Sequence, residues 1–84
     1  MSAQDWFLYI VECSNGALYT GVTRDITRRV HEHNHTKKGA KSLRNKLPVT
    51  LKYTEILNSY SEALKREREI KSWKRSKKLA LLHL

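Results

Sequence analysis

Alternating blocks of apolar and polar residues along the chain predict two strands, a helix, a third strand and two further helices. Residues 6–13 are rich in aromatic and β-branched side chains, which is typical of a strand covered on both faces. A turn signal at residues 14–16 and a second apolar run over residues 17–23 predict that the first two strands form a hairpin. Residues 49–57 alternate well enough to be a third strand, which should complete a small sheet.

The length of the hairpin loop decides which side chains share a face of the sheet, because register fixes the side of every residue. With a two-residue loop at 15–16, Tyr9 and Tyr19 would point to opposite faces. With a three-residue loop at 14–16 and its glycine in the left-handed conformation, Tyr9 pairs with Gly21 and lies diagonally to Tyr19 on one face. We predict the three-residue loop.

Three helices follow from the remaining patterns. Asp25 is placed to cap a helix over residues 26–35. A second helix should begin after a cap at Ser61 and run to about Lys74, and Ser76 should cap a short terminal helix.

Polar residues occupy positions of the first helix that should be buried. Arg29 and His33 fall on the same stripe as Ile26 and Val30, at the i, i+3, i+4 and i+7 spacing of an inward face, whereas Arg28 projects away. A purely structural alternative is that Arg29 lays its aliphatic stem along the edge of the core and His33 is a hydrogen-bonded buried histidine.

Glu67 is a second polar residue on an inward stripe. It lies three residues after Leu64 and three before Ile70, in the middle of the apolar face of the second helix. An i,i+4 ion pair with Lys71 would account for its spacing but not for its inward direction.

Charge points to a polyanionic partner. The 84 residues are enough for one domain, residues 1–84, and carry 17 Lys and Arg against 8 Asp and Glu, giving +9 at pH 7. This excess favours nucleic acid over solubility alone, and the thin apolar face of the last helices disfavours a membrane surface. Residues 36–47 hold five cations and one glycine, and contact with phosphate or simple solvation fits this loop equally well.

Several classes of site are excluded by composition. Cys13 is the one cysteine, so an intramolecular disulfide and a zinc site built from cysteines are impossible, and a reducing cytoplasm suits the protein. His31 and His35 cannot join His33 in a metal site, because residues i and i+2 of a helix point apart. We expect no export signal, no membrane span and a monomer.

The spacing of these residues resembles the GIY-YIG nuclease superfamily. The pattern runs from Phe7-Leu8-Tyr9 over ten residues to Tyr19-Thr20-Gly21, over ten more to Arg29, and then to His33-Asn34, with Glu67 in the place of the family's metal-binding glutamate. Phe7 stands where the first motif has glycine, and Thr20 stands where the second has isoleucine. The similarity covers residues 6–82, and Gly39-Ala40-Lys41 with Lys71-Ser72-Trp73 make it most similar to the small stand-alone YhbQ-like branch.

The resemblance implies an α+β fold, with a three-stranded antiparallel sheet flanked by helices. It also implies metal-dependent hydrolysis of DNA phosphodiester bonds, on structured or damaged DNA in repair or recombination, without a small-molecule cofactor. Glu67 would hold Mg²⁺ or Mn²⁺, and Arg29 would grip a nonbridging oxygen. Tyr9 or Tyr19 would accept a proton from the attacking water, with its pKa lowered by the metal and Arg29, and His33 is the alternative base or a phosphate ligand. We favour Tyr9 as the base and Tyr19 as the residue that orients water or phosphate.

Seven further residues are expected to contact the substrate: Gly21, Thr23, Arg28, Lys38, Lys41, Arg44 and Lys71. Two other functions fit the same residues. The chain would be a nucleic-acid-binding module without catalysis, or a basic adaptor that docks on an acidic protein surface.

Overall fold

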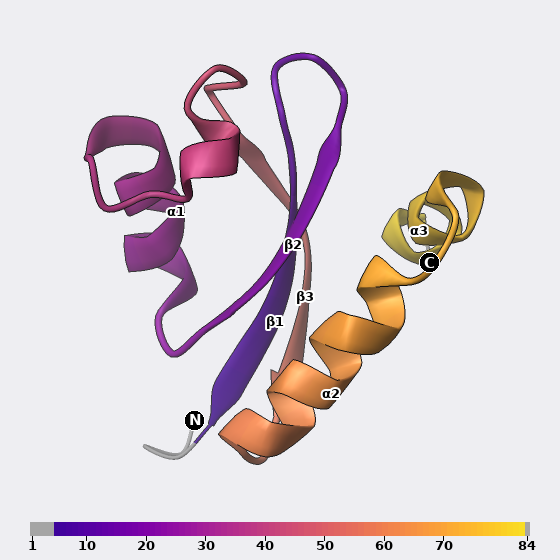
Figure 1. The fold of residues 1–84 in the computed structure, drawn as a ribbon. Helices are drawn as coiled ribbons and strands as arrows, with labels where there is room; N and C mark the ends of the chain where they lie inside the picture. Colours follow the sequence, from indigo (N-terminus) through magenta and orange to yellow (C-terminus); the bar gives the residue numbers. More distant parts are fainter. Residues whose placement is uncertain (1–4, 84) are drawn as a thin grey trace.

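A three-stranded antiparallel sheet divides the protein into two layers of helices. The computed structural model describes residues 5–83. The strands are β1 (Trp6–Glu12), β2 (Leu18–Thr23) and β3 (Thr50–Leu57), in the order β2-β1-β3. Helix α1 (Ile26–His35) and the 3₁₀ turn η1 (Lys41–Leu43) cover one face, while α2 (Tyr60–Lys71) and α3 (Arg75–Leu82) cover the other (Figure 1). The predicted fold class is therefore confirmed.

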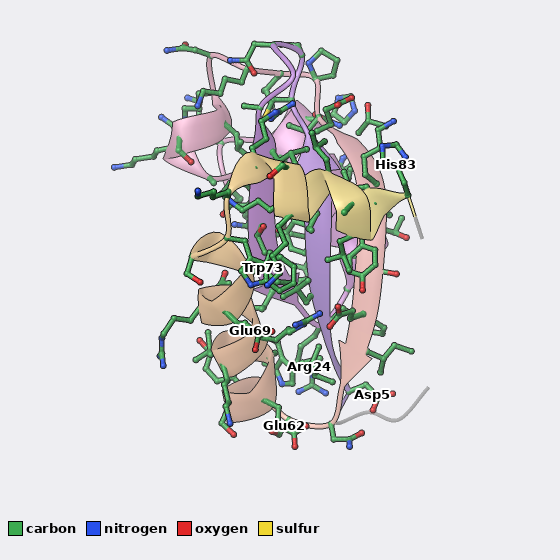
Figure 2. The ribbon with its side chains drawn as sticks, turned by 90° about the vertical axis from the view of Figure 1, so that its right-hand side faces the viewer. Asp5, Arg24, Glu62, Glu69, Trp73 and His83 are labelled. Carbon is green, nitrogen blue, oxygen red and sulfur yellow. The ribbon has the colours of Figure 1, made fainter. Side chains whose placement is uncertain are left out.

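The central strand β1 has both faces covered, as its composition predicted. Tyr9, Val11 and Cys13 are buried against Leu43 and Val49 on the side of α1. On the opposite face, Leu8 and Ile10 pack against Ile70 of α2, with Trp73 and Leu82 completing that cluster. Figure 2 views this second face, with Trp73 between α2 and α3.

The hairpin has the predicted three-residue loop. Tyr9 pairs with Gly21 and Val11 with Tyr19, so the two tyrosines lie on one face of the sheet. Gly16 has φ +86°, a conformation that glycine adopts at little cost. Its N–H donates to the carbonyl of Cys13 at 2.9 Å.

Polar contacts attach α1 to Val49, the residue before β3, and α2 to β3 itself. Asn34 of α1 accepts a hydrogen bond from the N–H of Val49 at 2.8 Å and donates one to its carbonyl at 3.0 Å. On the other face, Arg66 of α2 forms an ion pair with Glu55 of β3 at 2.9 Å. β3 also holds a bulge, since Ile10 pairs with Tyr53 and Val11 with Leu51.

The predicted caps of α2 and α3 are wrong. Ser59, not Ser61, is the N-cap of α2, and its hydroxyl accepts the N–H of Glu62 at 3.2 Å. Helix α3 begins at Arg75 after Lys74, without a side-chain cap, so Ser76 lies inside the first turn. The Asp25 cap of α1 is confirmed, with its side chain accepting the N–H of Arg28 at 3.0 Å. None of the helices found in residues 5–83 is both long enough and apolar enough to cross a membrane.

Replacing Ser59 with alanine should lower the free energy of unfolding by about 1 kcal/mol, because a helix N–H loses its acceptor. In a domain of this size we expect a fall of roughly 4–8 °C in melting temperature. Ser61→Ala is the matched control and should change the melting temperature little. Equal losses for the two variants would contradict the assignment of the cap to Ser59.

Candidate active site

Tyr9 is held beneath α1, with its ring over the edge strand β2. Its side chain is buried, with 1% of the residue exposed. A Cβ added to the facing residue Gly21 would lie 2.5 Å from the Tyr9 hydroxyl oxygen and 2.6 Å from Cζ, far inside van der Waals contact. Glycine at position 21 is therefore what allows the phenol to reach across β2.

His33 fixes the Tyr9 hydroxyl from the side of α1. The His33 side chain is buried, and its Nε2 lies 2.8 Å from Tyr9 Oη. Its Nδ1 accepts the backbone N–H of Ala40 at 3.2 Å. Because Nδ1 is an acceptor, the neutral ring carries its proton on Nε2 and donates it to the Tyr9 oxygen.

The loop after α1 supplies these contacts through its backbone. A Cβ added to Gly39 would lie 2.7 Å from the Cα of His33 and 3.0 Å from the carbonyl oxygen of Glu32, so glycine permits this close approach to α1. Arg29 Nη1 donates to the carbonyl of Lys38 at 2.9 Å and to Glu32 at 3.2 Å. Residues 38–40 thereby set the positions of both inward polar residues of α1.

Tyr19 completes a cluster of three rings. It lies edge-on to the His33 ring, with centroids 5.6 Å apart, and 6.3 Å from the Tyr9 ring. Tyr19 is half-buried, whereas Tyr9 and His33 are buried. Of the two hydroxyl-bearing rings, Tyr19 is therefore the more accessible to solvent.

Burial dominates the electrostatics of this cluster. Burial and the neighbouring Tyr19 raise the pKa of Tyr9 to about 12, although Arg29 acts in the opposite sense. We expected Arg29 and a metal to lower this pKa; the effect of Arg29 is present but is outweighed by burial. Burial, assisted by the positive charge of Arg29, lowers the pKa of the His33 imidazole, so the ring is neutral at pH 7.

Glu67 lies in the layer of helices opposite to α1 (Figure 1). It lies on α2, its side chain is 19% exposed, and it pairs with Lys71 Nζ at 3.3 Å. Its negative charge is the smallest of the effects that shift the pKa of Tyr9, behind burial, Tyr19 and Arg29. Glu67 is thus partly buried, as its inward position predicted, and it forms the ion pair with Lys71 that we weighed as the alternative to a metal-binding role. The metal-binding role of Glu67 stays a prediction.

The donor set around Glu67 fits a hard divalent cation. Mg²⁺ keeps several waters and takes one or two carboxylates together with substrate oxygens, so a single half-buried Glu67 is sufficient from the protein. Within residues 5–83, no three or more His, Cys, Asp or Glu residues are grouped to hold a metal ion. A site that needs more protein ligands, such as structural zinc, is therefore not formed by this part of the chain.

The residues expected to contact substrate differ in their exposure and in their place in the fold. Arg28 is 71% exposed on the outer side of α1, where it pairs with Glu32, and Lys38, Lys41 and Arg44 are exposed in the basic loop. Gly21 is buried beneath Tyr9, and Lys71 pairs with Glu67. Thr23 caps the turn before α1, where its hydroxyl accepts the N–H of Asp25 at 3.2 Å.

Sequence reasoning missed Glu32, Gly39 and Ala40. Glu32 gives Arg29 its acidic partner, and Ala40 sets the tautomer of His33. The one available signal was Gly39, a glycine within a loop of long cationic side chains.

Comparisons with known proteins identify the family of the chain. The GIY-YIG catalytic domain matches residues 5–80. A UPF0213 protein of Staphylococcus aureus is 51% identical over 76 residues, which span 90% of this chain and 92% of the relative. A UPF0213 protein of Desulfotalea psychrophila is 48% identical over 77 residues, spanning 92% of this chain and 70% of the relative. The solution NMR structure of the UPF0213 protein of Bacillus halodurans is 39% identical, with a TM-score of 0.61, and the match covers 95% of this chain and 84% of that one. The chain therefore belongs to the GIY-YIG nuclease family, in its branch of small stand-alone proteins.

Proposed function

We propose that this protein is a divalent-metal-dependent endonuclease that hydrolyses phosphodiester bonds of structured or damaged DNA, with a role in repair or recombination. The observation that carries the proposal is the hydrogen-bonded cluster of Tyr9 and His33 beside Tyr19 and Arg29. A core that served only for packing would not need these polar side chains on its inward faces. Family membership supports the reaction class.

In the proposed reaction, water attacks phosphorus, the bond from phosphorus to the leaving oxygen breaks, and the leaving oxygen takes a proton from solvent water. Tyr9 Oη, in its ionised form, accepts the proton of the water. His33 stabilises that form by donating Nε2–H to the same oxygen. Arg29 turns its guanidinium toward a nonbridging oxygen, and the more accessible Tyr19 orients the water or the phosphate.

His33 is a poor first base in this arrangement. Its Nδ1 is occupied by the Ala40 N–H, and its Nε2 already carries a proton. Glu67 is the residue that would hold the cation, which when bound supplies positive charge that offsets the charge developing on the phosphate and leaving oxygen and favours ionised Tyr9.

The test is cleavage of a panel of labelled DNAs of equal length: plain duplex, nicked duplex, flap and branched junction. Each is incubated with the full chain in Mg²⁺, in Mn²⁺ or in excess chelator. If the proposal is correct, we expect cleavage products with either metal, preferentially from the nicked or branched substrates, and no products in chelator. Failure to cut any substrate in any metal would overturn it.

A non-catalytic nucleic-acid-binding module is the second candidate, and the Glu67–Lys71 ion pair favours it, because a carboxylate already neutralised by lysine is a weaker cation ligand. If this second candidate is correct, the protein will bind the same DNAs but give no cleavage product with any metal.

The cleavage rate should rise with pH between about 7 and 9, by close to tenfold per unit. The pKa of Tyr9 is about 12 without a metal ion, and a bound cation would lower it. A base whose pKa stays well above 9 is mostly protonated in this range, so its ionised fraction grows close to tenfold for each pH unit. If His33 were the base, its lowered pKa would make the rate nearly constant above pH 7. Single-turnover rates measured across this range decide between them, and Tyr9→Phe should lose the slope.

A further inference from the structure

The positive charge of the chain is concentrated in two segments. Residues 37–46 and 71–78 together hold ten of the 17 Lys and Arg, and neither segment contains Asp or Glu. The remaining seven cations share the rest of the chain with all eight acidic residues. The net charge of +9 therefore arises from these two segments alone.

The tip of the β1–β2 hairpin, residues 14–16, joins the two segments. The N–H of Ser14 donates to the carbonyl of Lys46 at 2.9 Å, and Arg75 Nη2 donates to the carbonyl of Gly16 at 2.8 Å. The segments belong to opposite faces of the sheet and both contact the hairpin end (Figure 1). We call residues 14–16, 37–46 and 71–78 the basic end; Asp5 and Glu62 lie at the other end of the molecule (Figure 2).

Eight of the ten cations of the basic end are exposed, and Lys46 and Lys78 are half-buried. Lys41 and Arg44 are exposed on one side of the hairpin tip, and Lys74 is exposed on the other. Among the described residues, Lys71 is the one cation of these two segments that forms an ion pair with a carboxylate. Without acidic neighbours, such cations produce a positive potential that attracts a polyanion.

We infer that the basic end grips the sugar–phosphate backbone of duplex DNA beside the cleavage point, with one segment on each side of the hairpin tip. The major groove, about 12 Å wide, admits a two-stranded β-ribbon and has a phosphate chain along each edge. The small, polar tip Ser14-Asn15-Gly16 faces the groove in this arrangement, while residues 37–46 and 71–78 contact the two chains. The inference takes the identity of the polyanion from the proposed function and adds the surface that holds it.

The test measures the affinity for a plain duplex of about 20 base pairs, without divalent metal, over a series of salt concentrations. One variant removes two cations from the first segment, Lys41→Ala with Arg44→Ala, and another removes two from the second, Lys74→Ala with Lys78→Ala. Each lost phosphate contact should lower the slope of log K against log salt by about 0.9, so each pair lowers it by roughly 2 and the four together by roughly 4. Lys65→Ala with Arg68→Ala, on the exposed side of α2 among acidic residues, is the matched control and should leave the slope unchanged.

A second-segment variant that behaves like the control would overturn the two-sided grip. Tighter binding of single-stranded RNA of the same length, at equal salt, would show that the surface serves another nucleic acid. Because no metal is present, the salt slopes do not depend on cleavage. If the variants lower the slope as expected but the wild type cuts no DNA with any metal, the proposed function alone is contradicted. If the wild type cuts DNA but the variants leave the slope unchanged, the inferred role of the basic end alone is contradicted.

Discussion

Replacing Glu67 with glutamine is expected to slow cleavage of every DNA substrate strongly, while DNA affinity and melting temperature stay close to those of the wild type. Glutamine preserves the shape of the side chain but removes the charge that would hold the cation. Stabilisation of transition-state charge by a metal is worth several kcal/mol, and each 1.4 kcal/mol is tenfold in rate, so we expect a loss of roughly a thousandfold. Single-turnover cleavage in saturating Mg²⁺ measures this loss.

Glu69→Gln is the control for this variant. It removes the same charge from the same helix at a site that is 50% exposed and pairs with Arg66 rather than Lys71. Its cleavage rate should remain within a few-fold of the wild type. Undiminished cleavage by Glu67→Gln would remove Glu67 from the mechanism, whereas equal losses for both variants would indicate a general effect of charge on α2.

The face on which each candidate residue lies could be predicted from the sequence, because it follows from regular periodicity. The three-residue loop placed Tyr9 and Tyr19 on one side of the sheet, and the 3.6-residue period placed Arg29 and His33 on the inward face of α1. These positions depend on one or two neighbouring elements only. The same reasoning gave the inward direction of Glu67.

The contacts that give the cluster its chemistry could not be predicted in this way. Ala40 reaches His33, and Lys38 reaches Arg29, through backbone atoms of an irregular loop, and backbone contacts of that kind leave no periodic pattern. The extent of burial of Tyr9 depends on how closely this loop packs on α1. That packing raises the pKa of Tyr9, where local charge alone suggested that it would fall.

The N-cap of α2 was predicted wrongly for a similar reason, whereas the Asp25 cap of α1 was predicted correctly. Ser59 and Ser61 are both suitable N-caps by residue type, and the choice depends on where the chain leaves β3. The backbone of Ser59 is extended, with φ −154°, whereas Ser61 is already helical. A shift of two residues at a helix start leaves the apolar stripe of α2 unchanged, so the buried face could be predicted without the correct cap.

Gly21→Ala should disable the site while the fold persists, because the new methyl group would occupy the space of the Tyr9 phenol. The hydroxyl oxygen and Cζ of Tyr9 lie 2.5 and 2.6 Å from that position, and this buried ring, unlike the end of a flexible surface chain, has little room to move. Overpacking of this kind costs about 1–3 kcal/mol, and the displaced hydroxyl loses its 2.8 Å contact with His33. Misplacing a reacting group by about 1 Å costs roughly a hundredfold in rate, which is the loss we expect in single-turnover cleavage.

Gly16→Ala separates this steric effect from simple loss of stability. Gly16 has φ +86° and open space around it, so alanine there strains the turn by about 1 kcal/mol without touching the tyrosines. Both variants should therefore melt below the wild type. Cleavage is compared at a temperature where circular dichroism shows both folded and at protein concentrations that saturate the DNA, so that a change in affinity caused by the turn does not enter. Under these conditions only Gly21→Ala should lose cleavage. If the two variants lost cleavage in proportion to their melting temperatures, the close contact of Gly21 and Tyr9 would matter for folding alone, and the base assigned to Tyr9 would have to be sought at Tyr19.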